Sequence, residues 1–226
     1  MCGRFSLATS KEKLQQQLPF VDVAETLRVS YNIAPTQHAY VVTNDQPERL
    51  QHIVWGLVPQ WSNYGKNNGR LINARREGIE GKPSFRVPIR KRRCLVPADS
   101  FYEWRRENNR KIPYRIFQKN GDLLMFAGVW DVWYDGDYGL KTFSIITTPP
   151  NFEMASLHSR MPVILQTREE QETWLQTDDL SEVLALLRTP PDGTLDMYRV
   201  SELVNSVGND TPELHITVPE PPTLFD

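Results

Sequence analysis

The spacing of hydrophobic residues along the chain predicts many short strands and only a few short helices. Residue types that favour strands (Val, Ile, Phe, Tyr and Trp) are concentrated in residues 39–43, 52–57, 113–118, 123–130, 142–147, 162–165 and 197–200. Asn120 and Gly121 lie between two of these runs and predict a tight hairpin turn. Because strands do not alternate with helices, we expect an α+β fold with a mainly antiparallel, curved or barrel-like sheet core and peripheral helices.

Three segments carry helix signals. Thr9 and Glu12 have the spacing of a capping box before a helix over residues 10–18, and Thr167 and Glu170 repeat that signature. A further helix over residues 180–188 would place four apolar side chains on one face. We expect one domain over residues 1–226, with a loosely structured, proline-rich tail from about residue 211.

Composition narrows the class of protein. With 39% hydrophobic and 24% charged residues, the chain resembles an ordinary globular protein. Residues 1–7 hold no apolar segment behind a basic start, and no run is long enough for a membrane helix. Two cysteines without a CxxC pair and four scattered histidines predict free thiols, no metal and no cofactor. We expect a cytoplasmic monomer that does not bind membranes, nucleoid-associated if its source is bacterial.

Charge is distributed unevenly around the net value of −2. Residues 70–93 hold nine basic and two acidic residues, a local net charge of +7, whereas residues 166–226 hold three arginines against thirteen carboxylates. A basic stripe can bind phosphates on an acidic protein, because surface charges act within about 10 Å. The alternative is a solvated basic loop.

Cys2 is the residue with the most distinctive chemistry. Aminopeptidases remove Met1 when the next residue is small, which would leave an α-amine and a thiol on adjacent carbons. Their ordinary pKa values, about 8 and 8.5, keep a fraction of each group nucleophilic near neutral pH. Together they can convert an aldehyde into a thiazolidine ring, and the ring-opened sugar of an abasic DNA site is such an aldehyde. The alternative is an incidental cysteine at a frayed terminus.

The residues after Cys2 favour a terminus that is held in place. Gly3 permits close backbone approach, and Phe5 begins an apolar anchor. Arg4 supplies a cation that would bind a phosphate or lower the pKa of the thiol.

Separated motifs that follow one another in a fixed order resemble the SRAP (SOS-response-associated peptidase) family. They comprise residues 1–5 (MCGRF), 31–35 (YNIAP), 55–59 (WGLVP), 73–75 (NAR), 94–98 (CLVPA), 101–104 (FYEW), 157–162 (LHSRMP) and 207–209 (VGN). The resemblance spans nearly the whole chain, and the ordered set is far more specific than any one motif.

The resemblance implies a DNA-damage protein that shields abasic sites in single-stranded DNA, including single-strand to double-strand junctions, through a thiazolidine crosslink. It further implies removal of the protein's own Met1 and lyase-like chemistry at abasic sites. Cys2 would be the nucleophile, surrounded by the polar residues Asn73, Glu103 and His158.

Each of these polar residues also has a plainer interpretation. Glu103, between aromatic residues, would have a raised pKa and pass protons near neutrality, or would face solvent from a strand. His158 would protonate the sugar oxygen or the leaving hydroxyl, or would be a hydrogen-bonded loop residue. Asn73 would orient the open sugar or the backbone near Cys2, or would be a turn residue.

Cations within the motifs are the candidates for contacts with DNA phosphates. We assign Arg4, Arg75 and Arg160 to phosphates beside the lesion, with Arg86 and residues 90–93 as weaker candidates. Trp61 would stack on a base or wedge into a duplex end, or would belong to the core. Residues 61–70 are predicted to form a loop.

Two rival functions remain open. Class II glutamine amidotransferases also begin Met-Cys-Gly, but their two glutamine-holding motifs would have to overlap here in the single turn at Asn120 and Gly121. The second rival is a noncovalent single-stranded nucleic-acid binding module, which would bind undamaged strands equally well.

Overall fold

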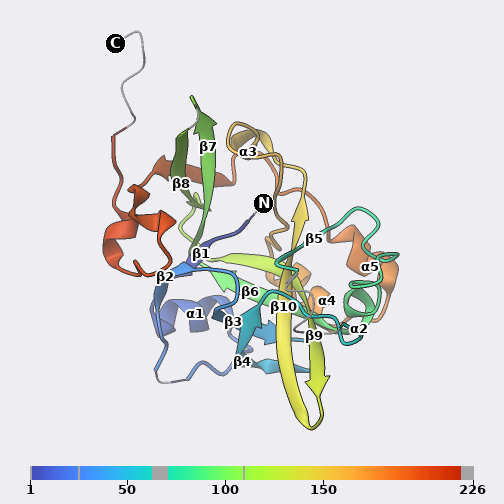
Figure 1. The fold of residues 1–226 in the computed structure, drawn as a ribbon. Helices are drawn as coiled ribbons and strands as arrows, with labels where there is room; N and C mark the ends of the chain where they lie inside the picture. The colour runs from blue at the N-terminus through green and yellow to red at the C-terminus, as the bar shows by residue number, and fades with distance from the viewer. Residues whose placement is uncertain (1, 25, 63–70, 109, 220–226) are drawn as a thin grey trace.

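Five strands close into a small barrel at the centre of the molecule (Figure 1). The computed structural model describes residues 2–24, 26–62, 71–108 and 110–219. The barrel strands are β3 (His38–Thr43), β4 (Gln46–Trp55), β6 (Arg93–Ala98), β9 (Leu124–Asp135) and β10 (Tyr138–Thr148). Neighbours are antiparallel except β10 and β4, whose parallel pairing closes the barrel. Two short strands also pair with β10: β5 (Asn73–Arg75) in parallel and β11 (Met161–Pro162) antiparallel.

A second sheet, entirely antiparallel, packs against the barrel. Its order is β12 (Leu195–Arg199), β8 (Arg110–Gln118), β7 (Ser100–Glu107), β1 (Phe5–Leu7) and β2 (Ser30–Ile33). Phe5 of β1 joins the two layers, because its ring lies 5.0 Å from that of Trp55 and 6.2 Å from that of Phe126. This packing buries the start of the chain between the sheet and the barrel.

The barrel interior is tightly filled. A Cβ atom added to Gly128 would lie 2.8 Å from Cys94 Sγ and 3.1 Å from the Ser144 carbonyl, so the pairing of β6, β9 and β10 requires glycine there. Cys94 is fully buried and burial raises the pKa of its thiol. We therefore assign Cys94 to the core.

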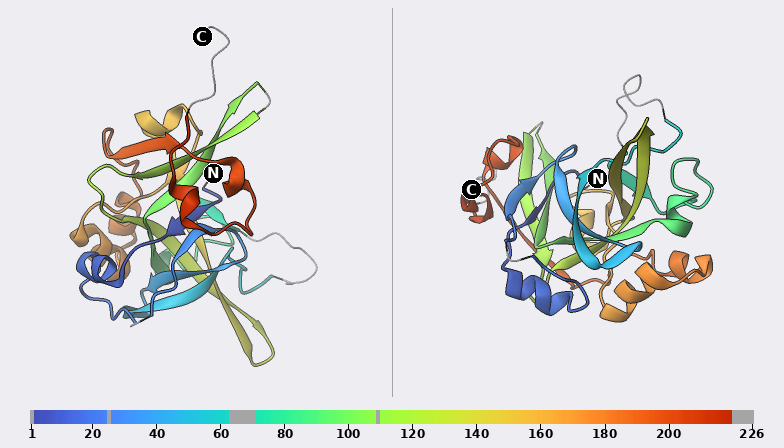
Figure 2. Two further views of the ribbon diagram at one scale, coloured as in Figure 1. Left: turned by 90° about the vertical axis from the view of Figure 1, so that its left-hand side faces the viewer. Right: turned by 90° about the horizontal axis from the view of Figure 1, so that it is seen from below.

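Helices lie at the periphery, as predicted. They are α1 (Lys11–Gln17), α2 (Pro88–Lys91), α3 (Phe152–Ala155), α4 (Arg168–Gln176) and α5 (Leu180–Ala185), with 3-10 turns η1 (Glu202–Asn205) and η2 (Pro212–His215). Figure 2 shows α1 and the α4–α5 pair along the lower edge of its right-hand view, where Leu14, Trp174 and Val183 belong to one buried cluster. The α+β class with a barrel-like core and peripheral helices is thus confirmed.

The structure confirms one of the two predicted capping boxes and contradicts the predicted hairpin. The capping box of Thr167 and Glu170 is present, but α1 is capped by Ser10, not Thr9, because the Lys13 N–H donates to Ser10 Oγ. Asn120 and Gly121 form a turn, with Gly121 at φ +82°, yet the prediction of a hairpin was wrong. The turn joins β8 to β9, which belong to different sheets.

The prediction of a loose tail from residue 211 was also wrong as far as residue 219. Leu214 of η2 is fully buried with Tyr102 and Val200, and the Val218 N–H donates to the Arg199 carbonyl. Prolines limit regular structure here without preventing packing. Residues 220–226 lie outside the described residues.

Candidate functional site

Cys2 directly precedes β1 and is held by contacts of the chain start with β5 and β7; the start of the chain is marked N near the centre of Figure 1. The Tyr102 N–H of β7 donates to the Arg4 carbonyl, and Phe5 pairs with Phe101, so the start of the chain is fixed along β7. Asn73 Nδ2 of β5 donates to the Cys2 carbonyl at 2.8 Å. The Cys2 side chain has no exposed surface. The terminus is therefore held rather than frayed.

Burial sets the state of the Cys2 thiol. Desolvation raises its pKa far above the ordinary value, and the negative charge of nearby Glu103 raises it further. Arg4 lowers this pKa only through its backbone carbonyl and not, as expected, through its charge, because the Arg4 guanidinium is engaged elsewhere. Its Nη1 donates to Asn32 Oδ1 and to the Val204 carbonyl, each at 2.7 Å. The thiol of the buried Cys2 is thus held in its neutral form.

Glu103 is a buried carboxyl group of β7. It is only 3% exposed, which excludes the alternative of a solvent-facing strand residue. Burial raises the pKa of its carboxyl group above the ordinary value, as the aromatic sequence around it predicted. A carboxyl group whose pKa is shifted toward neutrality, beside a buried thiol, is suited to accept and return protons.

His158 follows α3 and lies in a short loop that leads into β11. The Arg160 backbone N–H donates to His158 Nδ1 at 3.0 Å, so the neutral ring carries its proton on Nε2. Burial lowers the pKa of this histidine, and the positive charge of Arg106 on β7 lowers it further. The imidazole is therefore mostly neutral at pH 7.

Strand β10 brings Asn73 and the loop of His158 to one end of the barrel. Ile145 of β10 pairs with Asn73, and Thr147 of the same strand pairs with both Arg75 and Pro162. Asn73 Oδ1 is buried and has no hydrogen-bond partner among the described residues. An unsatisfied buried acceptor costs stability, and such groups are common where a ligand completes the site.

The predicted DNA-contacting residues differ in how much of each is accessible. Trp61 is 67% exposed, and Arg75 and Arg86 are exposed as well. Arg160 forms a two-pronged ion pair with Glu77, at 2.7 and 2.9 Å, and also donates to the Thr147 carbonyl. Arg4 and Arg160 thus already have protein partners, whereas Trp61, Arg75 and Arg86 present their side chains to solvent. Of the loop predicted for residues 61–70, residues 63–70 lie outside the described residues.

Part of the basic stripe is structural, contrary to its interpretation as a phosphate-binding surface. Arg93 is only 1% exposed and donates to the carbonyls of Trp174, Ile89, Arg90 and Thr177. Arg92 forms an ion pair with the buried Asp131. Four consecutive basic residues at 90–93 do not reveal that Arg93 is buried in the core.

Two residues, one within a motif and one two positions after a motif, have no role predicted from the sequence. Asn32 accepts from Arg4 and donates through Nδ2 to the carbonyls of Ser206 and Asn209, which ties β2 to the C-terminal segment. Glu77 holds the side chain of Arg160 and thereby the loop of His158. Presence within or beside a motif was the available signal, but the sequence does not reveal these pairings.

The described residues contain no group of three or more His, Cys, Asp or Glu side chains placed to hold a metal ion. No helix in that part of the chain combines the length and apolarity needed to cross a membrane.

Comparison with known proteins places these features in a family. A model of the SOS response associated peptidase (SRAP) family matches residues 1–207. The abasic site processing protein YoqW of Bacillus subtilis is 41% identical over 222 residues, covering 95% of this chain and 98% of that protein. The abasic site processing protein HMCES of Pongo abelii is 32% identical over 265 residues, and the match covers 94% of this chain and 75% of the length of HMCES.

A solved structure supports the same assignment. The crystal structure of a Bacteroides thetaiotaomicron protein superposes with a TM-score of 0.85 at 29% identity, covering 96% of this chain and all of that one. Together with the family match over most of the sequence, this shows that the chain belongs to the SOS response associated peptidase family.

Proposed function

We propose that this protein processes abasic sites in single-stranded DNA by bonding covalently to them through Cys2. The observation that carries the proposal is the fixed position of Cys2. Asn73 donates a hydrogen bond to the Cys2 carbonyl, and the charge of Glu103 is close enough to shift the pKa of the thiol. The names of relatives such as YoqW, which describe abasic site processing, support the same substrate.

The proposed chemistry needs both nucleophiles of Cys2. Hydrolysis of the Met1–Cys2 peptide bond, which consumes one water, frees the α-amine. That amine adds to the aldehyde carbon of the open sugar and expels water, which gives an imine. The thiol then adds to the imine carbon, its proton passes to the nitrogen, and a thiazolidine ring closes. The condensation of the processed terminus with DNA thus loses one water, which balances the water consumed in removing Met1, and the sequence of steps requires no cofactor.

Each polar neighbour takes a role that fits its environment. Glu103, with its raised pKa, accepts a proton from the α-amine and returns one as the sugar opens. His158 donates through Nε2–H to the sugar ring oxygen or the leaving hydroxyl. Asn73 keeps the Cys2 backbone in place, and its buried Oδ1 is an acceptor for a sugar hydroxyl.

The finer activities rest on the same groups. Self-removal of Met1 would use Cys2 with Glu103 as the proton carrier, and lyase chemistry would proceed from the imine before ring closure. Arg75, Arg86 and Trp61, all exposed, are proposed to hold the flanking strand, and Arg4 and Arg160 to lie closest to the lesion.

The test is to incubate the protein with a single strand carrying one abasic site, then to heat the mixture in denaturant and measure the shifted band. We expect a heat-stable adduct with wild type and none with Cys2→Ala or with a protein whose terminus is blocked by a tag. Equal yields from wild type and Cys2→Ala would refute the proposal. Equal affinity for damaged and undamaged strands without an adduct would favour a noncovalent binding module, and glutaminase activity would favour an amidotransferase.

A further inference from the structure

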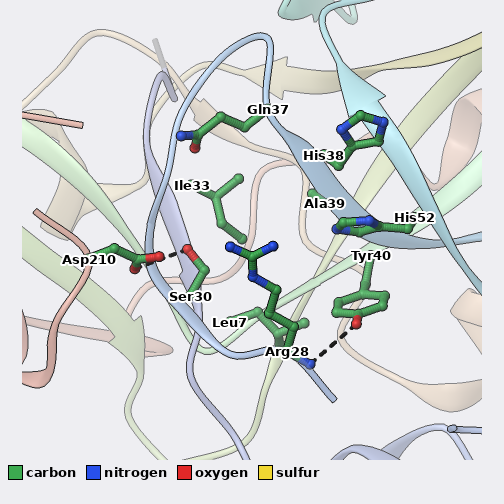
Figure 3. A pocket seen from close by; sticks show the side chains of 10 residues that line it. All are labelled: Leu7, Arg28, Ser30, Ile33, Gln37, His38, Ala39, Tyr40, His52 and Asp210. Carbon is green, nitrogen blue, oxygen red and sulfur yellow. Dashed lines mark hydrogen bonds between the residues drawn. The ribbon is translucent and has the colours of Figure 1, made fainter. Parts of the chain in front are cut away.

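A pocket outside the Cys2 site gathers several groups that can bind an anion. It has a volume of about 260 Å³ and is lined by residues of β1, β2, β3 and β4 and of the segment that leads into β2 (Figure 3). Figure 3 shows the Arg28 side chain rising into this pocket between Ser30 on one side and His52 on the other. Leu7, Ile33 and Ala39 are its apolar lining residues, each at most 5% exposed.

Aromatic rings form one wall of the pocket. The ring of His52 lies 5.1 Å from that of His38 and 4.9 Å from that of Tyr40, so the three side chains make a column with its polar edges toward Arg28 (Figure 3). The Tyr40 hydroxyl accepts a hydrogen bond from the Arg28 backbone at 3.2 Å, which fixes the loop against the wall. Imidazole N–H groups and a guanidinium thus face one space.

The pocket has an excess of positive groups. Asp210 is the carboxylate among its lining residues, and it already accepts hydrogen bonds from Ser30 Oγ and the Tyr31 backbone N–H. Burial lowers the pKa of His52, and the positive charges of His38 and Arg28 lower it further. Three basic side chains against one carboxylate, which already accepts two hydrogen bonds, favour an anionic ligand.

The pocket is close to the Cys2 site. Leu7 lines it and is five residues from Cys2, a stretch of chain that spans at most about 18 Å. A relay of hydrogen bonds also connects the two sites, from the Gln37 carbonyl on the rim through Trp55 to the Ile72 carbonyl next to Asn73. The wall of the pocket at Leu7 therefore lies at most about 18 Å from Cys2.

We propose that the pocket of Arg28, His38 and His52 binds a phosphodiester of the single strand that runs away from the Cys2 site. This inference rests on the proposed function for the identity of its ligand. The phosphate accepts from the Arg28 guanidinium and from the histidine N–H groups. The pocket lengthens the DNA footprint without taking part in the covalent step.

The experiment measures binding of undamaged single strands, so it does not depend on any reaction of Cys2. Arg28→Gln removes one positive charge from the pocket, and Arg168→Gln is the matched control, because Arg168 is an exposed arginine on α4 paired with Glu172. We expect Arg28→Gln to weaken binding roughly twofold to fivefold and to reduce the salt slope by about 0.7, the loss of one phosphate contact. The control is expected to bind like wild type.

Strand length and pH provide two further readouts. The Arg28→Gln defect is expected with a long undamaged strand and is expected to vanish with a strand too short to span the distance between the Cys2 site and the pocket. Because a bound phosphate favours the protonated ring, the strand is expected to raise the pKa of His52 in a proton NMR titration. Binding should therefore tighten as pH falls through that pKa, and less so in His52→Gln.

Equal affinities of Arg28→Gln and Arg168→Gln for the long strand, with unchanged melting temperatures, would overturn the proposal. If deoxyadenosine monophosphate raises the pKa of His52 but the strand does not, the pocket binds free phosphates and the proposal also fails. Failure of the proposed function is distinguishable, because it removes the abasic-site adduct while leaving these binding measurements intact.

Discussion

Replacement of Asn73 tests how the site holds Cys2. Its Nδ2 donates a 2.8 Å hydrogen bond to the carbonyl of a fully buried residue. Asn73→Leu keeps a similar volume but removes the donor, and a buried carbonyl that loses its partner costs about 1–3 kcal/mol. Since each 1.36 kcal/mol corresponds to a factor of ten in rate, crosslinking at saturating DNA should slow roughly 5-fold to 150-fold.

The assay is single-turnover formation of the abasic-site adduct, followed on a denaturing gel, with a thermal melt of each variant. Asn73→Asp is the comparison, because it keeps an acceptor in place of Oδ1 but sets a carboxylate against the Cys2 carbonyl. We expect it to be at least as slow as Asn73→Leu. A folded Asn73→Leu protein that crosslinks at the wild-type rate would refute the idea that this hydrogen bond positions the nucleophile.

Further predictions follow from the buried charges. Burial raises the pKa of Glu103, so the carboxylate is lost, and crosslinking slows, as pH falls through a value above the ordinary range. Glu103→Gln should slow crosslinking and abolish this decrease of the rate at low pH. An unchanged pH profile of the rate would contradict the role of Glu103. Burial lowers the pKa of His158, so its neutral form persists below the ordinary value; His158→Ala should mainly alter sugar opening or release, measured as adduct reversal, and unaltered kinetics would leave it a structural part. Arg93→Met should lower the free energy of unfolding by about 2–5 kcal/mol without changing the salt slope of DNA binding. Arg86→Gln should reduce that salt slope and leave the free energy of unfolding unchanged. Denaturation and binding titrations check both predictions.

Periodicity predicted the elements better than their partners. The strand over 142–147 and the capping box at Thr167 were found because alternation and capping depend on residues close in sequence. The partners of those strands depend on packing between distant segments. Nothing local indicates that β10 pairs in parallel with β4, or that the turn at Gly121 leads from one sheet to the other.

The same division applies to the candidate site. The motifs named Cys2, Asn73, Glu103 and His158, and the aromatic neighbours of Glu103 correctly indicated a raised pKa. The interpretation of Arg93 as a phosphate-binding residue was wrong because it rested on charge alone. The sequence does not distinguish an exposed arginine from one whose guanidinium is bound by four backbone carbonyls. The hydrogen bond of Arg4 to Asn32 was likewise unpredictable, since it depends on how β2 lies beside the terminus.

The central claim is that one residue supplies both the amine and the thiol of the crosslink. The direct measurement is mass spectrometry of the adduct after digestion with nuclease and trypsin, which releases residues 2–4 because Arg4 is a cleavage site. We predict that this peptide begins at Cys2, carries the sugar less one water, and resists borohydride because the imine has closed to a thiazolidine. An adduct on another residue, on a peptide that retains Met1, or in a form that borohydride reduces would contradict the account.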